Sequence, residues 1–229
     1  MDRSSPPSNS AMFCRSMEEK PSNRPAFPYK PLDPSVDCNR LLALFPCDKR
    51  RPDIVRCKLF TVRFAEKPLY EALSYTWGES KPAETILLNG EPFAIQENLY
   101  NALDNLRPTG DRPRMLWADA ICIDQGNLEE RKRQVGLMDY IYTRASTVLI
   151  WLGRGTPEVQ EVFAKKFKHL KRPTFPTIKQ KEELDRAATK QKGWCQWVYQ
   201  RTYWTRLWVI QEVGLSKNLR VCIGRLSKP

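Results

Sequence analysis

A strand–helix–strand pattern over residues 115–153 is the strongest constraint on the fold of this chain of 229 residues. Residues 115–124 (MLWADAICID) begin apolar on both faces, as in a central strand that is covered on both sides. Asn127 and Glu130 then have the spacing of a helix capping box, and apolar side chains recur at helical spacing. Residues 146–153 (STVLIWLG) predict a second buried strand. Together they predict a right-handed βαβ unit with parallel strands.

Three apolar segments before this unit are predicted to be extended. Residues 38–46 form the first apolar run and are expected to be a short edge element. Residues 53–62 alternate and contain β-branched side chains, which is typical of a strand. Residues 71–78 (EALSYTWG) are predicted as the next strand, and Gly78 allows the chain to leave it sharply. Since open parallel sheets bind ligands beyond the carboxyl ends of their strands, the loops after these strands are where a site is expected.

A hairpin and a helix are predicted between the strands. Asn89-Gly90 separates two apolar runs within residues 85–95, which is a strong signal for a two-residue hairpin turn. A helix over residues 98–107 should follow, with Asn98 as its N-cap. Its apolar side chains recur on one face and predict the buried stripe. That stripe consists of Leu99, Ala102, Leu103 and Leu106.

These elements predict one α/β domain with a mostly parallel central sheet flanked by helices and an antiparallel hairpin. The domain is expected to span residues 38–229, because residues 1–37 are rich in Pro and Ser and predict a disordered segment. A variable basic insertion is expected near residues 154–192. Further helices are predicted over 157–170 and near 180–191, and a last strand over residues 219–224.

The distribution of positive charge along the chain does not favour a nucleic-acid site. The net charge is +12, and much of the excess lies within residues 165–192. That stretch lacks the interleaved aromatic side chains of a single-strand binder, so a solvated insertion is the favoured interpretation. Nucleic-acid binding is therefore the weakest functional hypothesis.

Cysteine and histidine usage argues against metal and triad chemistry. The seven cysteines are irregularly spaced without a CxxC pair, which disfavours zinc and a disulfide framework. The single histidine, His169, lies in a Lys-rich stretch that predicts a solvated helix face. No apolar run approaches the roughly 20 residues that span a bilayer, and no signal peptide is evident. A soluble, cytoplasmic protein without a metal is expected.

Three carboxylates are candidate site residues. Asp119 lies inside an apolar strand, where a charge is costly unless it is paired, and Arg206 is a candidate partner. Asp124 lies where that strand ends. Glu212 follows an apolar run on a predicted helix. Each also has a structural interpretation: Asp119 fastens the core to a loop, Asp124 caps a turn, and Glu212 forms a buried salt bridge or hydrogen bond. Trp77 and Trp208 are large amphipathic side chains, which are more often core residues than platforms for a ligand.

Three segments, in this order, resemble the fungal heterokaryon-incompatibility (HET) domain: LSYTWG (73–78), WADAICIDQ (117–125) and RLWVIQE (206–212). The resemblance covers roughly Leu69 to Gly224. It implies a role in fungal nonself recognition, in which such domains act as toxic effectors that cause programmed cell death. The family is also distantly similar to TIR domains, which have a flavodoxin-like fold. Family members often continue further, so a short or truncated member is expected.

The resemblance leaves two functional hypotheses open. Some TIR domains only assemble and recruit partners, which implies self-association or protein partners and an exposed apolar patch. Others cleave NAD at the nicotinamide–ribose bond with a glutamate, which would make NAD a substrate and this chain an NAD glycohydrolase. Glu212 would then be the catalytic carboxylate, with Asp124 or Asp119 as the second. The nucleotide would be bound by stacking on Trp77, Tyr75 or Trp208 and by Arg206 at the phosphates.

Overall fold

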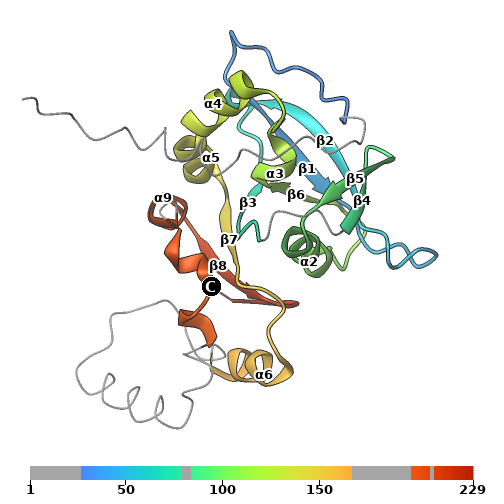
Figure 1. The fold of residues 1–229 in the computed structure, drawn as a ribbon, viewed down its shortest axis with the longest axis vertical. Helices are drawn as coiled ribbons and strands as arrows, with labels where there is room; N and C mark the ends of the chain where they lie inside the picture. Colours follow the sequence, from blue (N-terminus) through green and yellow to red (C-terminus); the bar gives the residue numbers. More distant parts are fainter. Residues whose placement is uncertain (1–26, 79–83, 167–196, 207–208, 229) are drawn as a thin grey trace, which may run out of the picture.

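The computed structural model describes residues 27–78, 84–166, 197–206 and 209–228, and Figure 1 shows their arrangement. One nine-stranded sheet runs through them in the order β5-β4-β2-β1-β6-β3-β7-β8-β9. The strands are β1 Cys38–Leu44, β2 Arg56–Arg63, β3 Glu71–Ser74, β4 Glu84–Leu88, β5 Glu91–Ile95, β6 Arg114–Trp117, β7 Thr147–Trp151, β8 Leu219–Ile223 and β9 Leu226–Lys228. The α-helices are α2 Glu97–Leu106, α3 Asp119–Cys122, α4 Leu128–Gly136, α5 Met138–Arg144, α6 Pro157–Lys166 and α9 Val209–Gly214, with 3₁₀ helices η1 Phe64–Glu66 and η2 Thr202–Thr205.

The sheet is mixed, and the expectation of a mostly parallel sheet is wrong. Parallel pairing joins β6, β3, β7 and β8 in the centre and also joins β2 to β4. Antiparallel pairing joins β1 to both β2 and β6, β4 to β5, and β8 to β9, and it covers more residue pairs. The physical reason is the length of the connections. Parallel neighbours need a long crossover, whereas β4–β5 and β8–β9 are joined by two-residue turns that permit only antiparallel pairing.

Strand β1 is central rather than an edge element, which corrects the prediction for residues 38–46. It lies between β2 and β6, and all seven of its residues are buried. Its antiparallel register with β2 runs from Cys38 opposite Arg63 to Leu44 opposite Cys57. The polar Asn39 and Arg40 are buried along with its apolar residues, as expected of a strand that is covered on both faces.

The predicted strand–helix–strand unit is present in a modified form. Strand β6 ends at Trp117, and the chain turns at once into α3, so Asp119 begins a helical turn instead of lying inside a strand. The following helix is broken at Leu137 into α4 and α5. Strand β7 is confirmed, but β3 lies between β6 and β7 and pairs in parallel with both.

The hairpin and the helix after it are confirmed. Asn89 and Gly90 adopt left-handed φ angles of 55° and 90°, as the turn between β4 and β5 requires. The predicted stripe of α2 is buried. Asn98 is not the N-cap, however, because the helix begins one residue earlier, after Gln96. The Asn98 amide instead donates to the carbonyl of Thr76 at 2.6 Å and accepts from the indole of Trp151 at 2.9 Å.

The remaining predictions fall partly outside the described residues. Helix α6 accounts for the first part of the predicted helix over 157–170, whereas the helix near 180–191 lies outside them. Strand β8 is confirmed, and β9 was not predicted. Within the part of the chain that is described, no helix is long and apolar enough to cross a membrane.

Two apolar clusters form the core. The larger one lies around β1, β3, β6, α2 and α5. The smaller one lies around β7, β8, α6 and η2 and is composed of Ile150, Leu152, Val159, Phe163, Tyr203, Val209 and Ile223. In Figure 1, α6 and α9 lie near the β7–β8 end of the sheet, and α2 lies nearer β4. The segment that carries Tyr203 therefore belongs to the smaller cluster.

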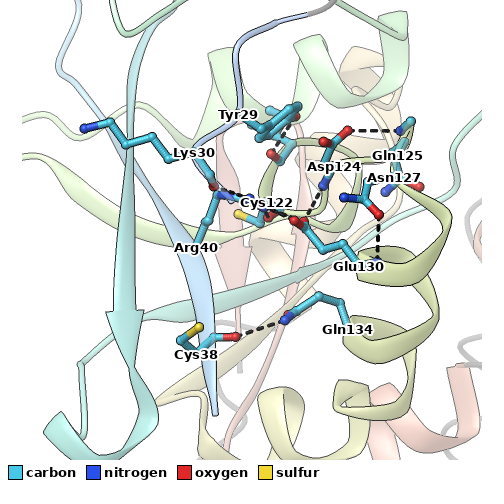
Figure 2. Close-up of polar contacts among 12 residues, drawn as sticks. Tyr29, Lys30, Cys38, Arg40, Cys122, Asp124, Gln125, Asn127, Glu130 and Gln134 are labelled. Atoms are coloured by element: carbon cyan, nitrogen blue, oxygen red, sulfur yellow. Dashed lines mark hydrogen bonds and ion pairs between the residues drawn. The ribbon is translucent and has the colours of Figure 1, made fainter. Parts of the chain in front are cut away.

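A buried ion pair fastens α4 to β1 (Figure 2). The guanidinium of Arg40 is only 2% exposed and binds both carboxylate oxygens of Glu130, with Nη2 and Oε2 2.9 Å apart. The same guanidinium donates to the carbonyls of Lys30 at 2.7 Å and Cys122 at 3.2 Å. Glu130 also accepts the backbone N–H of Asp124 at 2.8 Å. The pair thus joins the N-terminal segment, β1, the end of α3 and α4.

Replacing Arg40 by Met should lower the free energy of unfolding by about 3–5 kcal/mol, because Glu130 is left as a buried charge without its partner. The double variant Arg40→Met/Glu130→Met should lose much less, because both charges are then absent. Urea unfolding measures the difference. Lys132→Met, which removes the exposed pair with Glu129, is the control and should change the free energy by about 0–1 kcal/mol. Additive losses in the double variant would contradict the pairing.

Candidate functional site

A buried chain of hydrogen bonds lies at the carboxyl end of β3. Ser74, the last residue of that strand, donates its hydroxyl proton to Oε2 of Glu212 on α9. The Ser74 hydroxyl also lies 2.6 Å from the hydroxyl of Tyr203 on η2. Arg206, between η2 and α9, donates to both oxygens of Glu212 at 2.9 and 3.2 Å. Every acceptor atom of this carboxylate therefore has a partner, and Glu212 is only 1% exposed.

Burial and pairing act in opposite directions on these groups. Burial raises the pKa of Glu212 above its ordinary value, although the Arg206 guanidinium and the Ser74 hydroxyl lower it in part. Burial also disfavours the charge on Arg206, but the carboxylates of Glu212 and Asp119 outweigh it and raise the pKa of the guanidinium. Arg206 thus remains charged between two carboxylates.

Asp119 forms the second carboxylate contact of this region. Its Oδ2 accepts the indole N–H of Trp77 at 2.7 Å, and its Oδ1 accepts the backbone N–H of Ala120 at 2.8 Å. Burial raises the pKa of Asp119 above its ordinary value, and the Trp77 donor and the Arg206 charge lower it in part. Tyr75 is buried as well, and the charge of Asp119 adds to the burial that raises the pKa of its phenol.

The structure therefore brings together most of the residues that the sequence singled out. The carboxylates of Asp119 and Glu212 both stabilise the positive charge of Arg206. Trp77 and Tyr75 lie against Asp119. The third aromatic candidate, Trp208, lies outside the described residues. Ser74 and Tyr203 were not predicted. Ser74 is recognisable as the polar residue that follows the apolar Ala72 and Leu73 of β3, whereas nothing distinguishes Tyr203 from the other aromatic residues of its segment.

Asp124 lies in the other polar cluster, which Figure 2 shows. Its carboxylate accepts the backbone N–H of Gly126 at 3.1 Å, so that it stabilises the turn before α4. Its charge is one of the factors that raise the pKa of Tyr29, whose hydroxyl donates to the carbonyl of Ile121. These contacts match the turn-capping interpretation, and within the described residues Asp124 forms no hydrogen bond or ion pair with Glu212 or Asp119.

A cavity of about 230 Å³ lies beside the buried chain, at the carboxyl ends of β3 and β7. It is lined by Thr76, Gly78, Asn98, Trp151, Leu152, Gly153, Arg201, Thr202 and Tyr203. Tyr203 connects this cavity to the buried carboxylate, because its hydroxyl contacts Ser74, which in turn donates to Glu212. Glu212 itself does not line the cavity. The volume is below the ~300–1,000 Å³ of pockets for drug-sized ligands.

No metal centre is formed by the part of the chain that the structure describes, where three or more His, Cys, Asp or Glu side chains never gather around one point. Its cysteines are free, and burial raises the pKa of the Cys57 and Cys122 thiols to about 12. Such thiols stay protonated at neutral pH and behave as small apolar core residues.

The fold and the buried cluster define an α/β domain with a mixed sheet whose polar residues converge at one strand end. The family described as "Heterokaryon incompatibility protein (HET)" matches residues 70–212, from just before β3 to Glu212. The chain belongs to this family. It is also similar to Heterokaryon incompatibility protein 6, OR allele, of Neurospora crassa, with 31% identity over 84% of the chain. The chain covers about a third (34%) of that relative's length. No solved structure matches it significantly.

The stability difference between wild type and Glu212→Gln should depend on pH. The native state holds the Glu212 proton at a higher pH than the unfolded chain does, because the folded pKa is raised. The unfolded state therefore binds fewer protons, and the contribution of Glu212 to stability falls as the pH rises from about 4.5 through the raised pKa. This is measured by determining the free energy of unfolding of both proteins from pH 4 to pH 8, in steps of about one pH unit. A contribution that grows with pH would contradict the direction of the shift.

Replacing Trp77 by Phe should destabilise the chain by about 1–3 kcal/mol, because Asp119 then loses its indole donor while it stays largely buried. The double variant Trp77→Phe/Asp119→Leu removes both partners and should recover part of that loss. Thermal and urea unfolding measure both variants. Equal stability of Trp77→Phe and wild type would show that the Trp77–Asp119 bond contributes nothing.

Proposed function

We propose that this chain is a heterokaryon-incompatibility effector domain that triggers programmed cell death in fungal nonself recognition, acting in the cytoplasm by assembly and partner recruitment. The observation that carries the proposal is the saturation of Glu212. Both oxygens of this carboxylate are bound within the protein, by Ser74 and Arg206, and the side chain is shielded from solvent. A carboxylate in this state stabilises the fold and is not presented to a ligand.

The surface supports the same proposal. Large apolar side chains are exposed at several places, and the most exposed is Leu69 at 83%. Apolar surface that is rimmed by polar side chains is typical of protein–protein contacts, and Leu69 lies beside Phe64 and Tyr70 within a rim of cationic side chains. The family and the name of the Neurospora relative support a role in incompatibility. Recruitment by such a surface needs no ionised carboxylate in a pocket.

A second candidate is an NAD glycohydrolase similar to TIR enzymes, and the convergence of Asp119, Arg206 and Glu212 beside a cavity favours it. Cleavage of the bond between nicotinamide and ribose leaves oxocarbenium character on the sugar, which the Glu212 carboxylate would stabilise. Arg206 would bind phosphate, with Trp77 or Tyr75 against the base. This function requires Glu212 to leave Ser74 so that the sugar can reach it.

Expression of wild type and Glu212→Gln in a fungal host, with death and cellular NAD scored together, tests the two candidates. Glutamine keeps the size of the side chain and one oxygen that can accept from Ser74 and from one Arg206 nitrogen. Its amide nitrogen cannot accept from the second Arg206 nitrogen, so the fold of the variant is checked by circular dichroism first. If the chain acts by assembly, Glu212→Gln should still kill, and NAD should stay constant before death. The opposite outcome is that the purified wild type releases nicotinamide from NAD and that Glu212→Gln lowers the rate of release at least ~100-fold. That outcome would reject assembly as the sole mechanism and establish the enzyme.

A further inference from the structure

Two surfaces of the chain are opposite in charge, and each carries an exposed leucine. The basic surface consists of Lys67, Leu69, Arg144 and Lys217, and the acidic surface consists of Phe27, Asp124, Leu128 and Glu129. We propose that copies of this chain bind one another through these surfaces, the basic surface of one copy against the acidic surface of the next. This proposal rests on the proposed function by assembly and names the contact that would perform it.

The basic surface surrounds an apolar notch. A cavity of about 210 Å³ lies between the 3₁₀ helix η1 and the end of α5, and its floor contains Phe64 and Tyr70. Leu69 lines it and projects into solvent. The charged residues of its lining are Lys67, Arg144 and Lys217, all cationic.

The cations of this surface are available to a partner. Lys67, Arg144 and Lys217 have no ion pair within the described residues. Arg144 lies over the ring of Tyr140 at 4.7 Å, and that ring packs edge-on against Phe64. The guanidinium is therefore held at the notch with its charge uncompensated. The carboxylates nearest in the chain, such as Glu66, do not line the cavity.

The acidic surface has the opposite character. A broad, open cavity of about 660 Å³ lies at the start of α4, and the charged residues of its lining are Asp124 and Glu129. Lys132, outside the lining, pairs with Glu129 at 3.2 Å, but both side chains of this pair are mostly exposed, and such surface pairs are weak enough for a partner's cation to replace Lys132. Leu128, the first residue of α4, is 58% exposed at this cavity. Phe27 forms its apolar wall and is fixed edge-on against Phe93 at 5.3 Å between ring centroids. The wall is thus held in place by the fold.

Charge decides which surfaces can meet. Two basic surfaces repel each other, as do two acidic ones, whereas a basic surface against an acidic one places opposite charges around exposed leucines. The net charge of +12 opposes association at long range, but charges beyond about 8 Å are screened at physiological salt. The pairs at the contact therefore dominate. An occupant with the required chemistry, an apolar side chain among carboxylates, is present on the chain itself.

The two surfaces share no residue, so one copy can use both at once. A contact between two different surfaces of identical chains is heterologous. It continues from copy to copy and yields rings or open chains instead of closed dimers. Such growth suits an effector that acts by assembly, because each added copy presents the same free surface to the next.

The test is sedimentation velocity of the purified full chain and two charge-reversal variants at physiological salt. Arg144→Glu and Glu129→Lys should each weaken self-association at least about tenfold, because like charges then meet at the contact. The chain with both substitutions should regain association, because the reversed charges pair again. Arg112→Glu and Glu91→Lys make the same charge changes at exposed positions outside both cavities and should behave as wild type.

The outcomes separate this contact from the proposed function. A chain that self-associates and kills, but is insensitive to both charge reversals, overturns the contact and leaves assembly in place. Failure of the double variant to regain association, with both single variants weakened and folded, also overturns it. If the chain kills while it stays monomeric, a second copy is not the partner of these surfaces. Loss of killing by Arg144→Glu would then indicate that the basic surface binds a different protein with an acidic surface.

Discussion

The buried carboxylate of Glu212 is the constraint on which the C-terminal part of the structure depends. Its transfer out of water is costly unless each oxygen finds a donor, and the donors come from two distant segments, Ser74 at the end of β3 and Arg206 after η2. Satisfying this one group positions α9 against the sheet and draws Tyr203 to Ser74. The smaller apolar cluster is thereby joined to the larger one at the strand end where the candidate site lies.

The ion pair between Arg40 and Glu130 follows the same rule in another part of the molecule. Here too a buried charge gathers partners from far apart in the chain, including the carbonyls of Lys30 and Cys122. The two clusters differ in their surroundings. The one around Glu212 adjoins a cavity through Tyr203, whereas the one around Arg40 is enclosed by β1, α3 and α4. Asp124, at the edge of the second cluster, lines the open cavity at the start of α4, whereas the Arg40–Glu130 pair itself is buried.

The architecture combines a parallel centre with antiparallel flanks, and this combination has functional consequences. Strands β3 and β7 run in the same direction, so their carboxyl ends gather Ser74, Thr76 and Gly153 at one edge, as in other open sheets. The antiparallel strands enlarge the sheet without adding to that edge. The exposed Leu69 and Leu128 lie elsewhere, before β3 and at the start of α4. The buried polar cluster and the two proposed contact surfaces therefore lie in different parts of the domain.

The sequence by itself determined the elements whose signals are local. The turn at Asn89-Gly90, the apolar stripe of α2, the alternating strand β2, the buried strand β7 and the last parallel strand β8 all follow from patterns within ten or so residues. Only the tertiary structure decided that β1 is central, that Asp119 begins α3, and that Asp124 lies apart from Glu212. The physical reason is that strand order and the partners of buried charges are set by contacts between segments far apart in the chain, which no local pattern encodes.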